Sequence, residues 1–323
     1  MGGMGAQVPS DGTLAFGMQL PVQAQSSLFA RPWEADAGAS EMVQVAQACE
    51  SAGFLYVAVC DHVAIPRRLA AAMSTSWWDT IATLSYLAAS TERIGLLSHV
   101  YVLPYRHPLV AAKAFATLDA LSGGRAIAGV GAGHVEGEFE ALEVDHGQRG
   151  RLLDEAIDAL RAALADEFPD HRGERWSFSG LGQRPRPVQA PLPVWVGGSS
   201  PAAMRRAAAK GDGWLPQGPP EGGMAAGVAA VLEQRASGPR AEERFVVGAL
   251  SGPLHVGDPS WDVGRTFAGP PEKLAAHLRT YREMGVHQVQ VGFASRSADE
   301  LCDQVAAFAA EVVPIVNDQS PGS

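Results

Sequence analysis

The chain has 323 residues, 46% hydrophobic and 7% aromatic, which is enough for a full core and argues against wholesale disorder. A net charge of −10 argues against a nucleic-acid partner, because like charges repel, and no basic stripe offsets it. No apolar run reaches the length of a membrane span, so we expect no membrane partner.

The start of the chain does not resemble a targeting segment. The first fifteen residues carry no positive charge and no apolar run, so we expect no signal peptide, and Ala at position 6 breaks the myristoylation pattern. The cysteines are widely spaced and odd in number, which predicts reduced thiols and a cytoplasmic location. They are Cys49, Cys60 and Cys302.

Eight short apolar runs are predicted to be strands. In chain order they cover 15–22, 54–60, 94–103, 126–132, 193–198, 212–216, 245–252 and 287–293. Their apolar character is nearly continuous, as expected for parallel strands covered on both faces. Amphipathic helical patterns separate most of them, and the clearest cover 41–53, 151–164 and 272–285.

Eight strands that alternate with helices predict an α/β fold, specifically a (β/α)8 barrel. A doubly wound sheet is the alternative, but it needs a phosphate loop after the first strand, and MQLPVQAQSS is not one. Segment 166–192 is predicted to be a short insertion after the helix that follows the fourth strand, with a hairpin at WSFSG. We expect disordered tails over 1–14 and 313–323 around one domain over 15–312.

Polar residues and small turn residues lie where the predicted strands end, which is the face of such barrels that holds the active site. They are Asp61 and His62 after the second strand, Ser98 and His99 in the third, Gly131, Ala132, Gly133, His134 and Glu138 at and after the fourth, Gly197, Gly198, Ser199 and Ser200 after the fifth, and His255 after the seventh. If the strands are right, these groups face one mouth of the barrel.

Each of these features also has a structural explanation. His62 could serve only to bond Asp61 or a loop, and His99 could be a satisfied barrel histidine. His134 and Glu138 have a spacing that suits a metal, but no third ligand accompanies them, so no metal site is predicted. The Gly-Gly-Ser-Ser turn before a helix suits a phosphate, although a tight turn explains it as well.

The order of these motifs resembles the bacterial luciferase-like monooxygenase superfamily. The similarity is densest in LPYRHPLVAAKAFATLDALSGGRAIAGVGAGHVEGEFEAL (103–142) and spans about residues 15–312. Further matching segments are GFLYVAVCDH (53–62), PVWVGGSSPAAMRRAAAKGDGWLP (193–216) and FAGPPEKLAAHLRTYREMGVHQVQV (267–291). The Leu-Pro-Tyr-Arg and Ser-Gly-Gly-Arg patterns are most similar to the branch that depends on the deazaflavin coenzyme F420.

The resemblance implies an enzyme that moves a hydride between C5 of coenzyme F420 and a small organic substrate, at a C=C, C=N or C=O/alcohol group. One alternative is an FMN-dependent two-component monooxygenase, which uses reduced flavin from a separate reductase together with O2. The other is a non-catalytic flavin-binding paralogue, which retention of His62, Glu138 and the Gly-Gly-Ser turn disfavours. The resemblance also implies a homodimer, packed through the helices beside the second and third strands.

Roles for single residues follow from the same resemblance. It implies that His62, beside Asp61, is the acid/base and that a non-proline cis peptide at His99–Val100 backs the cofactor ring. Positions that match cofactor contacts are Ser98, His99, Val100, Gly131, Ala132, Gly133, His134, Glu138, Gly197, Gly198, Ser199 and Ser200. His134 departs from the usual Trp of the family. We expect substrate contacts from Gln23, Trp77 and His255, and structural roles for Asp119 and Arg125.

Overall fold

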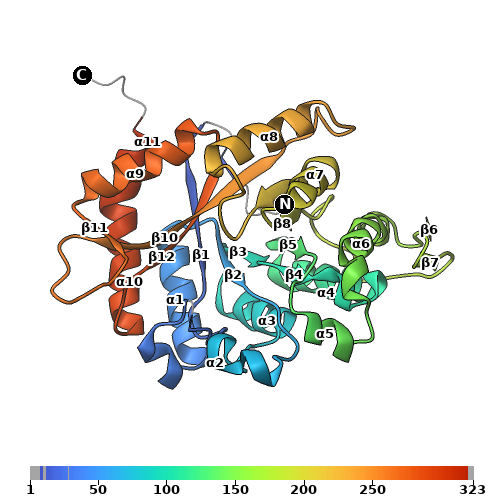
Figure 1. Ribbon diagram of the computed structural model, residues 1–323, viewed down its shortest axis with the longest axis horizontal. Helices are drawn as coiled ribbons and strands as arrows, with labels where there is room; N and C mark the ends of the chain where they lie inside the picture. The colour runs from blue at the N-terminus through green and yellow to red at the C-terminus, as the bar shows by residue number, and fades with distance from the viewer. Residues whose placement is uncertain (1–7, 10–11, 28, 319–323) are drawn as a thin grey trace.

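The computed structural model describes residues 8–9, 12–27 and 29–318, and eight parallel strands close into a barrel inside a layer of helices (Figure 1). The barrel strands are β1 (Ala15–Gln19), β2 (Tyr56–Val59), β3 (Gly95–Ser98), β5 (Ala126–Gly131), β8 (Val194–Gly197), β9 (Gly213–Leu215), β10 (Val246–Val256) and β12 (Gln288–Phe293). Each pairs in parallel with the next, and β12 pairs with β1. The predicted (β/α)8 barrel is therefore confirmed.

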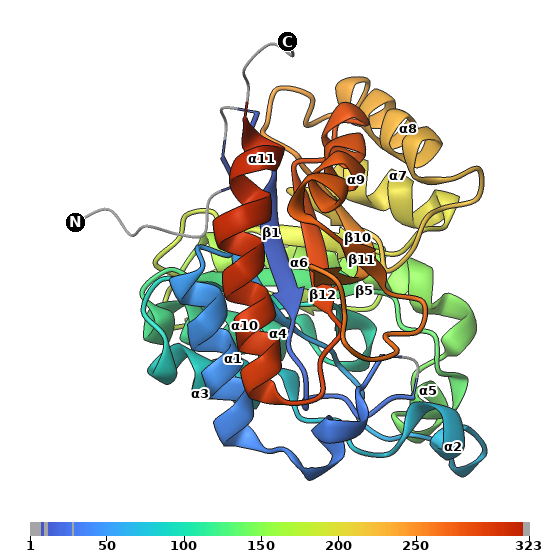
Figure 2. The same ribbon diagram turned by 90° about the vertical axis from the view of Figure 1, so that its left-hand side faces the viewer.

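Amphipathic helices cover the outside of the barrel. They are α1 (Ala39–Ser51), α3 (Thr80–Ser90), α4 (Pro108–Ser122), α6 (Arg149–Ala165), α7 (Pro201–Lys210), α8 (Met224–Ala236), α9 (Pro271–Glu283) and α10 (Ala298–Ala307). In α6, Leu153, Ile157 and Leu160 are fully buried at helical spacing, so one face packs on the barrel. Figure 2 shows α1 and α10 side by side outside β1.

The predicted strand 94–103 is divided in two. β3 ends at Ser98, and β4 (Tyr101–Val102) resumes beyond a bulge and pairs with β5. The His99–Val100 peptide in the bulge is cis, as predicted. Two glycines make room for it, since a Cβ on Gly131 or Gly197 would lie 2.4 Å from a methyl carbon of Val100.

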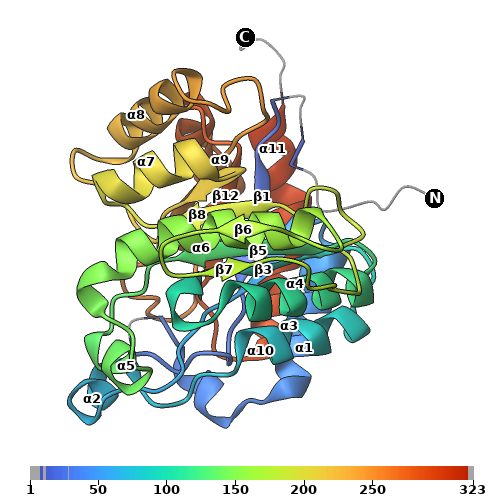
Figure 3. The ribbon, with the colours of Figure 1, turned by 90° about the vertical axis from the view of Figure 1, so that its right-hand side faces the viewer.

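The seventh barrel strand is longer than predicted. β10 passes a bulge near Ser251 and continues to Val256, where it pairs with β11 (Phe267–Gly269). In the insertion, β6 (His171–Arg172) and β7 (Ser177–Phe178) form the expected hairpin. Figures 1 and 3 place this hairpin outside α6.

The expected C-terminal tail begins later than residue 313. After α10 a π-helical turn leads into α11 (Val313–Asn317), because Val312 and Val316 continue the apolar spacing of the helix and are fully buried. The Asn317 side chain bonds the backbone N–H and C=O of Leu14, at 2.8 and 3.1 Å. Leu14, within the expected N-terminal tail, is therefore packed. Residues 1–7, 10–11 and 319–323 of the expected tails lie outside the described residues.

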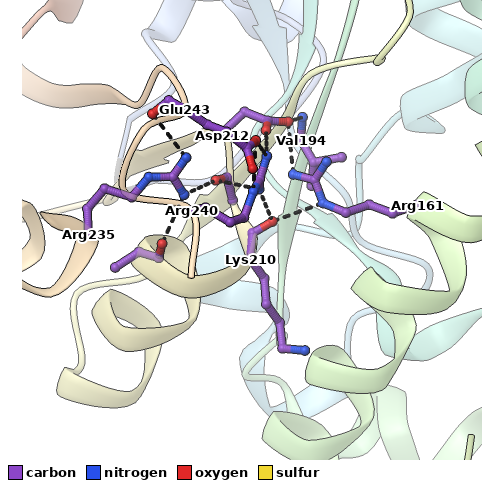
Figure 4. A network of polar contacts seen from close by, with 9 residues as sticks. Arg161, Val194, Lys210, Asp212, Arg235, Arg240 and Glu243 are labelled. Carbon is purple, nitrogen blue, oxygen red and sulfur yellow. Dashed lines mark hydrogen bonds and ion pairs between the residues drawn. The ribbon is translucent and has the colours of Figure 1, made fainter. Parts of the chain in front are cut away.

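A polar network ties the strands together at the amino ends of β8 and β9 (Figure 4). Asp212, which directly precedes β9, accepts bonds from the Arg161 and Arg240 guanidinium groups at 2.9 and 2.6 Å. It also accepts the backbone N–H of Val194, at 2.8 Å. This network lies at the end of the strands opposite the predicted site.

Arg125 and Asp119 have the structural roles predicted for them. Arg125 is 4% exposed and donates to the backbone oxygens of Ala88, Ile94 and Thr91, which fixes the start of β3. The Asp119 carboxylate accepts the backbone N–H of Ala126 at the start of β5. Within the described residues, no helix is long and apolar enough to cross a bilayer.

Candidate active site

A cavity of about 910 Å³ opens at the carboxyl ends of the barrel strands, and we call it the main cavity. Most of the predicted site residues line it, namely Asp61, His62, Trp77, His99, Val100, Gly131, Ala132, Gly133, His134, Gly197, Gly198, Ser199 and Ser200. Its volume lies in the upper range of natural ligand sites. The structure thus brings the ends of β2, β3, β5 and β8 to one place.

His62 is held by Glu138, which lies in the first turn of α5 (Glu136–Ala141). The Nδ1 atom of His62 lies 2.7 Å from Oε2 of Glu138. The other carboxylate oxygen accepts the backbone N–H groups of Val63 and Ala64, at 2.6 and 3.1 Å. Glu138 is 1% exposed and does not line the main cavity, so this geometry does not support the expected contact with cofactor. It stands behind His62.

The charge state of Glu138 fixes the proton on His62. Burial raises the pKa of Glu138, but hydrogen bonds from His62 and from the backbone of Ala64 and Val63 hold it below its ordinary value overall. Glu138 is therefore a carboxylate at neutral pH, and an acceptor requires that Nδ1 of His62 donates. The Nε2 atom of His62 is left as the nitrogen that can exchange a proton with a ligand.

Two rings flank His62 in the main cavity. The Trp77 ring centroid lies 4.3 Å from that of His62, and the His134 centroid lies 5.6 Å away, each edge to face. Burial and the neighbouring His62 lower the pKa of His134, so its ring is neutral at pH 7. Trp77 and His134 therefore shape the space around the exchangeable nitrogen.

Asp61 does not pair with His62. Its carboxylate takes both terminal nitrogens of Arg106, at 2.6 and 2.9 Å, and the backbone N–H of Val102 at 2.8 Å. With three hydrogen bonds to its carboxylate, Asp61 joins the end of β2 to β4 and holds Arg106. This bonding favours a positioning role for Asp61 over the expected catalytic role.

His99 forms part of the cavity wall as a neutral ring. Its Nδ1 lies 3.1 Å from Oε1 of Gln290, and its Nε2 lies 3.3 Å from the backbone oxygen of Leu215. Burial lowers the pKa of His99 to about 4. Ser98, expected beside the cofactor, instead donates to the Gly129 oxygen at 2.8 Å and does not line the main cavity.

Groups that could bind a phosphate collect where β8 leads into α7. Ser200 caps α7 by accepting the backbone N–H of Ala203, and the positive end of this helix dipole points to the turn. Arg149 and Arg206 line the same cavity. Sequence reasoning missed both arginines, because neither follows a strand. Their place in one cavity follows from the packing of α6 beside α7, which no local pattern in the sequence indicates.

Two expected substrate residues lie elsewhere. Gln23 is 1% exposed, accepts the backbone N–H of Cys60 at 3.1 Å and does not line the main cavity. His255 lies on the part of β10 beyond the bulge and does not line the main cavity. Among the described residues, no three His, Cys, Asp or Glu side chains group closely enough to hold a metal ion.

The family of the chain follows from comparison with known proteins. The model of the luciferase-like monooxygenase family matches residues 15–266. The chain therefore belongs to the luciferase-like monooxygenase family, a family of oxidoreductases.

Several proteins are similar in sequence. One uncharacterized protein of Mycobacterium tuberculosis is 30% identical over 185 residues, a match that spans 54% of this chain and 64% of that protein. A second from the same organism is 30% identical over 281 residues, which cover 83% of this chain and 92% of that protein. An FMNH(2)-dependent dimethylsulfone monooxygenase of Pseudomonas putida is 29% identical over 54% of this chain and 48% of its own.

Solved structures share the fold at low sequence identity. The monooxygenase RslO1 from Streptomyces bottropensis matches with a TM-score of 0.76 at 19% identity, over 93% of this chain and 99% of that one. An F420-dependent secondary alcohol dehydrogenase, in complex with an F420–acetone adduct, matches with a TM-score of 0.73 at 16% identity, over 95% of this chain and 100% of that one. The similar proteins thus include both flavin and deazaflavin enzymes.

Proposed function

We propose that the chain is a coenzyme F420-dependent oxidoreductase that transfers a hydride between deazaflavin C5 and a C=C, C=N or C=O/alcohol group of a small organic substrate. The observation that carries the proposal is the His62–Glu138 pair in the wall of the main cavity. Reduction of such a bond needs one hydride and one proton. A histidine held by a buried carboxylate is suited to supply that proton near neutral pH.

The residues present fit a deazaflavin cofactor. The bulge at His99–Val100 offers a wall for the ring, and glycines at 131 and 197 keep the neighbouring strands close to it. At the other end, the Gly197–Ser200 turn, the start of α7 and Arg149 offer donors to a phosphate and to the carboxylates of the F420 tail, while Arg206 is already paired with Asp154 at 2.7 Å. These donors suit a long anionic tail.

When bound, the reduced cofactor supplies the hydride. In the proposed reduction, Nε2–H of His62 gives its proton to the substrate atom that becomes electron-rich, and Glu138 keeps Nδ1 protonated. In oxidation of an alcohol, neutral Nε2 accepts the hydroxyl proton. Trp77 and the neutral His134 limit where the substrate lies and keep water from His62.

The second candidate is an FMN-dependent monooxygenase fed by a separate reductase. It is supported by the sequence similarity to the dimethylsulfone monooxygenase, whose name states dependence on FMNH(2). This candidate would use the same turn at Gly197–Ser200 for the flavin phosphate.

Isotope transfer tests the proposal. F420H2 carrying deuterium at C5 would be incubated anaerobically with the protein and a panel of small enones, imines and ketones. We expect deuterium in the product, detected by mass spectrometry. Turnover that needs reduced FMN and O2, with ¹⁸O from ¹⁸O2 in the product, would contradict the proposal and favour the second candidate.

Homodimerisation stays a prediction. Large apolar side chains are exposed on the two helices named by the family resemblance, with Tyr86 of α3 at 50%, and Val110 and Leu121 of α4 at 60% and 66%. Burial of such side chains against a second copy supports a dimer through α3 and α4. Light scattering of the purified protein checks this expectation.

A further inference from the structure

A second pocket opens beside the main cavity, at the carboxyl ends of β1, β10 and β12, and we call it the side pocket. It encloses about 240 Å³. It shares Gln19, Phe29 and Leu250 with the main cavity, so the two spaces meet at these side chains. His62 and the phosphate turn line only the main cavity, so the functions assigned above do not use the side pocket.

The walls of the side pocket are mostly apolar. Leu20, Pro21, Pro253, Val291, Phe293 and Leu301 contribute to them. Such walls suit a hydrocarbon chain or ring, since transfer of each methylene from water to an apolar wall is favourable. A few polar side chains interrupt this lining, and their partners decide what else the pocket can bind.

Most of these polar groups already have partners. The two carboxylate oxygens of Glu34 accept the backbone N–H groups of Val22 and Arg31, at 2.8 and 2.7 Å. The Ser295 hydroxyl accepts the indole N–H of Trp33 at 3.2 Å. Gln290 faces His99 across the wall of the main cavity, at 3.1 Å. The side pocket therefore ends next to the proposed ring site.

The Arg31 side chain is the exception. It lines the side pocket and is half-buried, and among the described residues none forms an ion pair with its guanidinium. The carboxylate of Glu34 is near enough to feel its charge but is bonded to the backbone instead. A guanidinium at an apolar wall pairs best with a carboxylate, which it can bind through two parallel hydrogen bonds.

We propose that the side pocket is the substrate subsite and takes a small apolar monocarboxylic acid, whose carboxylate pairs with Arg31. This inference rests on the proposed function, because the reacting carbon then lies where the side pocket meets the main cavity. One water molecule occupies about 30 Å³ in the liquid. At that volume for each non-hydrogen atom, the side pocket holds roughly eight non-hydrogen atoms. A phosphate dianion is disfavoured. Among the residues that line the side pocket, Arg31 carries the single positive charge, and the neighbouring Glu34 is acidic.

A matched pair of probes tests this subsite. Trans-2-hexenoate and trans-2-hexenamide have the same size and shape, and only the first carries a charge at neutral pH. Their affinities would be measured by calorimetry on the protein with and without F420. We expect the acid to bind at least about tenfold more tightly than the amide, and Arg31→Gln to reduce this ratio below about threefold. Arg68→Gln, a charge removed at an exposed position, should keep the ratio.

Equal affinity for the acid and the amide on the unaltered protein would overturn the proposal, as would undetectable binding of both. An acid preference that survives Arg31→Gln would overturn the role of Arg31. Because these measurements need no hydride transfer, they separate the two claims. A protein that prefers FMN but shows the Arg31-dependent acid preference would refute the proposed function and leave the subsite standing.

Discussion

In the proposed reaction, the proton that accompanies hydride transfer is assigned to two side chains far apart in the chain. His62 follows β2 and reaches the main cavity, while Glu138 comes from α5 and stays behind it, 2.7 Å from Nδ1. The proposed function therefore gives His62 the contact with substrate and gives Glu138 the orientation of His62. The two therefore have different expected mutational effects.

Removal of the proton donor should stop turnover without loss of the cofactor. We expect His62→Asn to lower kcat about 10²- to 10⁴-fold, because Asn cannot carry the proton, while the Kd for F420 changes less than about threefold. Steady-state kinetics on a substrate from the isotope screen and fluorescence titration measure the two quantities. His255→Asn, away from the cavity, is the matched control and should turn over normally. Normal turnover in His62→Asn would refute the assignment of His62 as the acid/base.

The buried neutral His99 should make stability depend on pH. Its native pKa of about 4 lies below the ordinary value of 6.5, so the unfolded chain binds a proton that the native state does not as pH falls between these values. The penalty is small above pH 6.5, grows as pH falls, and reaches about 2.5 kcal/mol near pH 4.5.

Urea unfolding of the wild type and of His99→Gln at pH 7 and pH 4.5 checks this prediction. The wild type should lose about 2–3 kcal/mol more than the variant on acidification, since glutamine does not titrate. The two proteins share all other titrating groups. Equal losses would show that His99 is not the group responsible.

At the scale of elements, the bulge between β3 and β4 depends on glycines in the neighbouring strands. A Cβ on Gly131 would lie 2.4 Å from Cγ2 of Val100. In a close-packed interior, β5 or the bulge would have to shift to relieve this contact. The wall of the ring site is therefore set jointly by three strands. One added methyl group should disturb it.

We expect Gly131→Ala to lower the free energy of unfolding by about 1–3 kcal/mol through overpacking and to weaken F420 binding. Val100→Ala in the same chain removes the clashing methyl groups and should recover at least half of the lost stability. Urea unfolding of the four members of this cycle measures the coupling. Additive effects, with no rescue, would mean that the clash is relieved elsewhere.

The network before β9 is a second feature at this scale. Asp212→Asn would leave the Arg161 and Arg240 guanidinium groups, both largely buried, without their shared carboxylate (Figure 4). We expect a loss of about 2 kcal/mol in unfolding free energy, with specific activity of the folded protein unchanged.

The matched control is Asp158→Asn. Asp158 pairs with Lys210 at a half-exposed position and should cost less than about 0.5 kcal/mol. A loss of activity in Asp212→Asn that exceeds the loss of folded protein would contradict the separation between the two ends of the barrel.

For the whole molecule, the barrel could be predicted because parallel strands buried on both faces are continuous apolar runs, and the helices between them repeat every three to four residues. His62, the turn at Gly197–Ser200 and the cis peptide also came from position at strand ends or from family resemblance. These features are encoded locally, within a few residues.

What the sequence did not predict depends on contacts between distant segments. Asp61 is next to His62 in the chain, yet the hydrogen-bond partner of the His62 ring is Glu138, 76 residues away. β10 continues past a bulge to His255, which does not line the main cavity, and the packing of α6 beside α7 brought Arg149 and Arg206 to one cavity. Neither adjacency nor periodicity carries this information.

The proposed function requires a main cavity that prefers a deazaflavin to FMN. A fluorescence titration of the cofactor-free protein with coenzyme F420 and with FMN, each oxidised and reduced, measures this preference directly. We expect F420 to bind at least about tenfold more tightly than FMN in the same redox state. Tighter binding of reduced FMN would contradict it and would place the chain among the enzymes of its family that use O2.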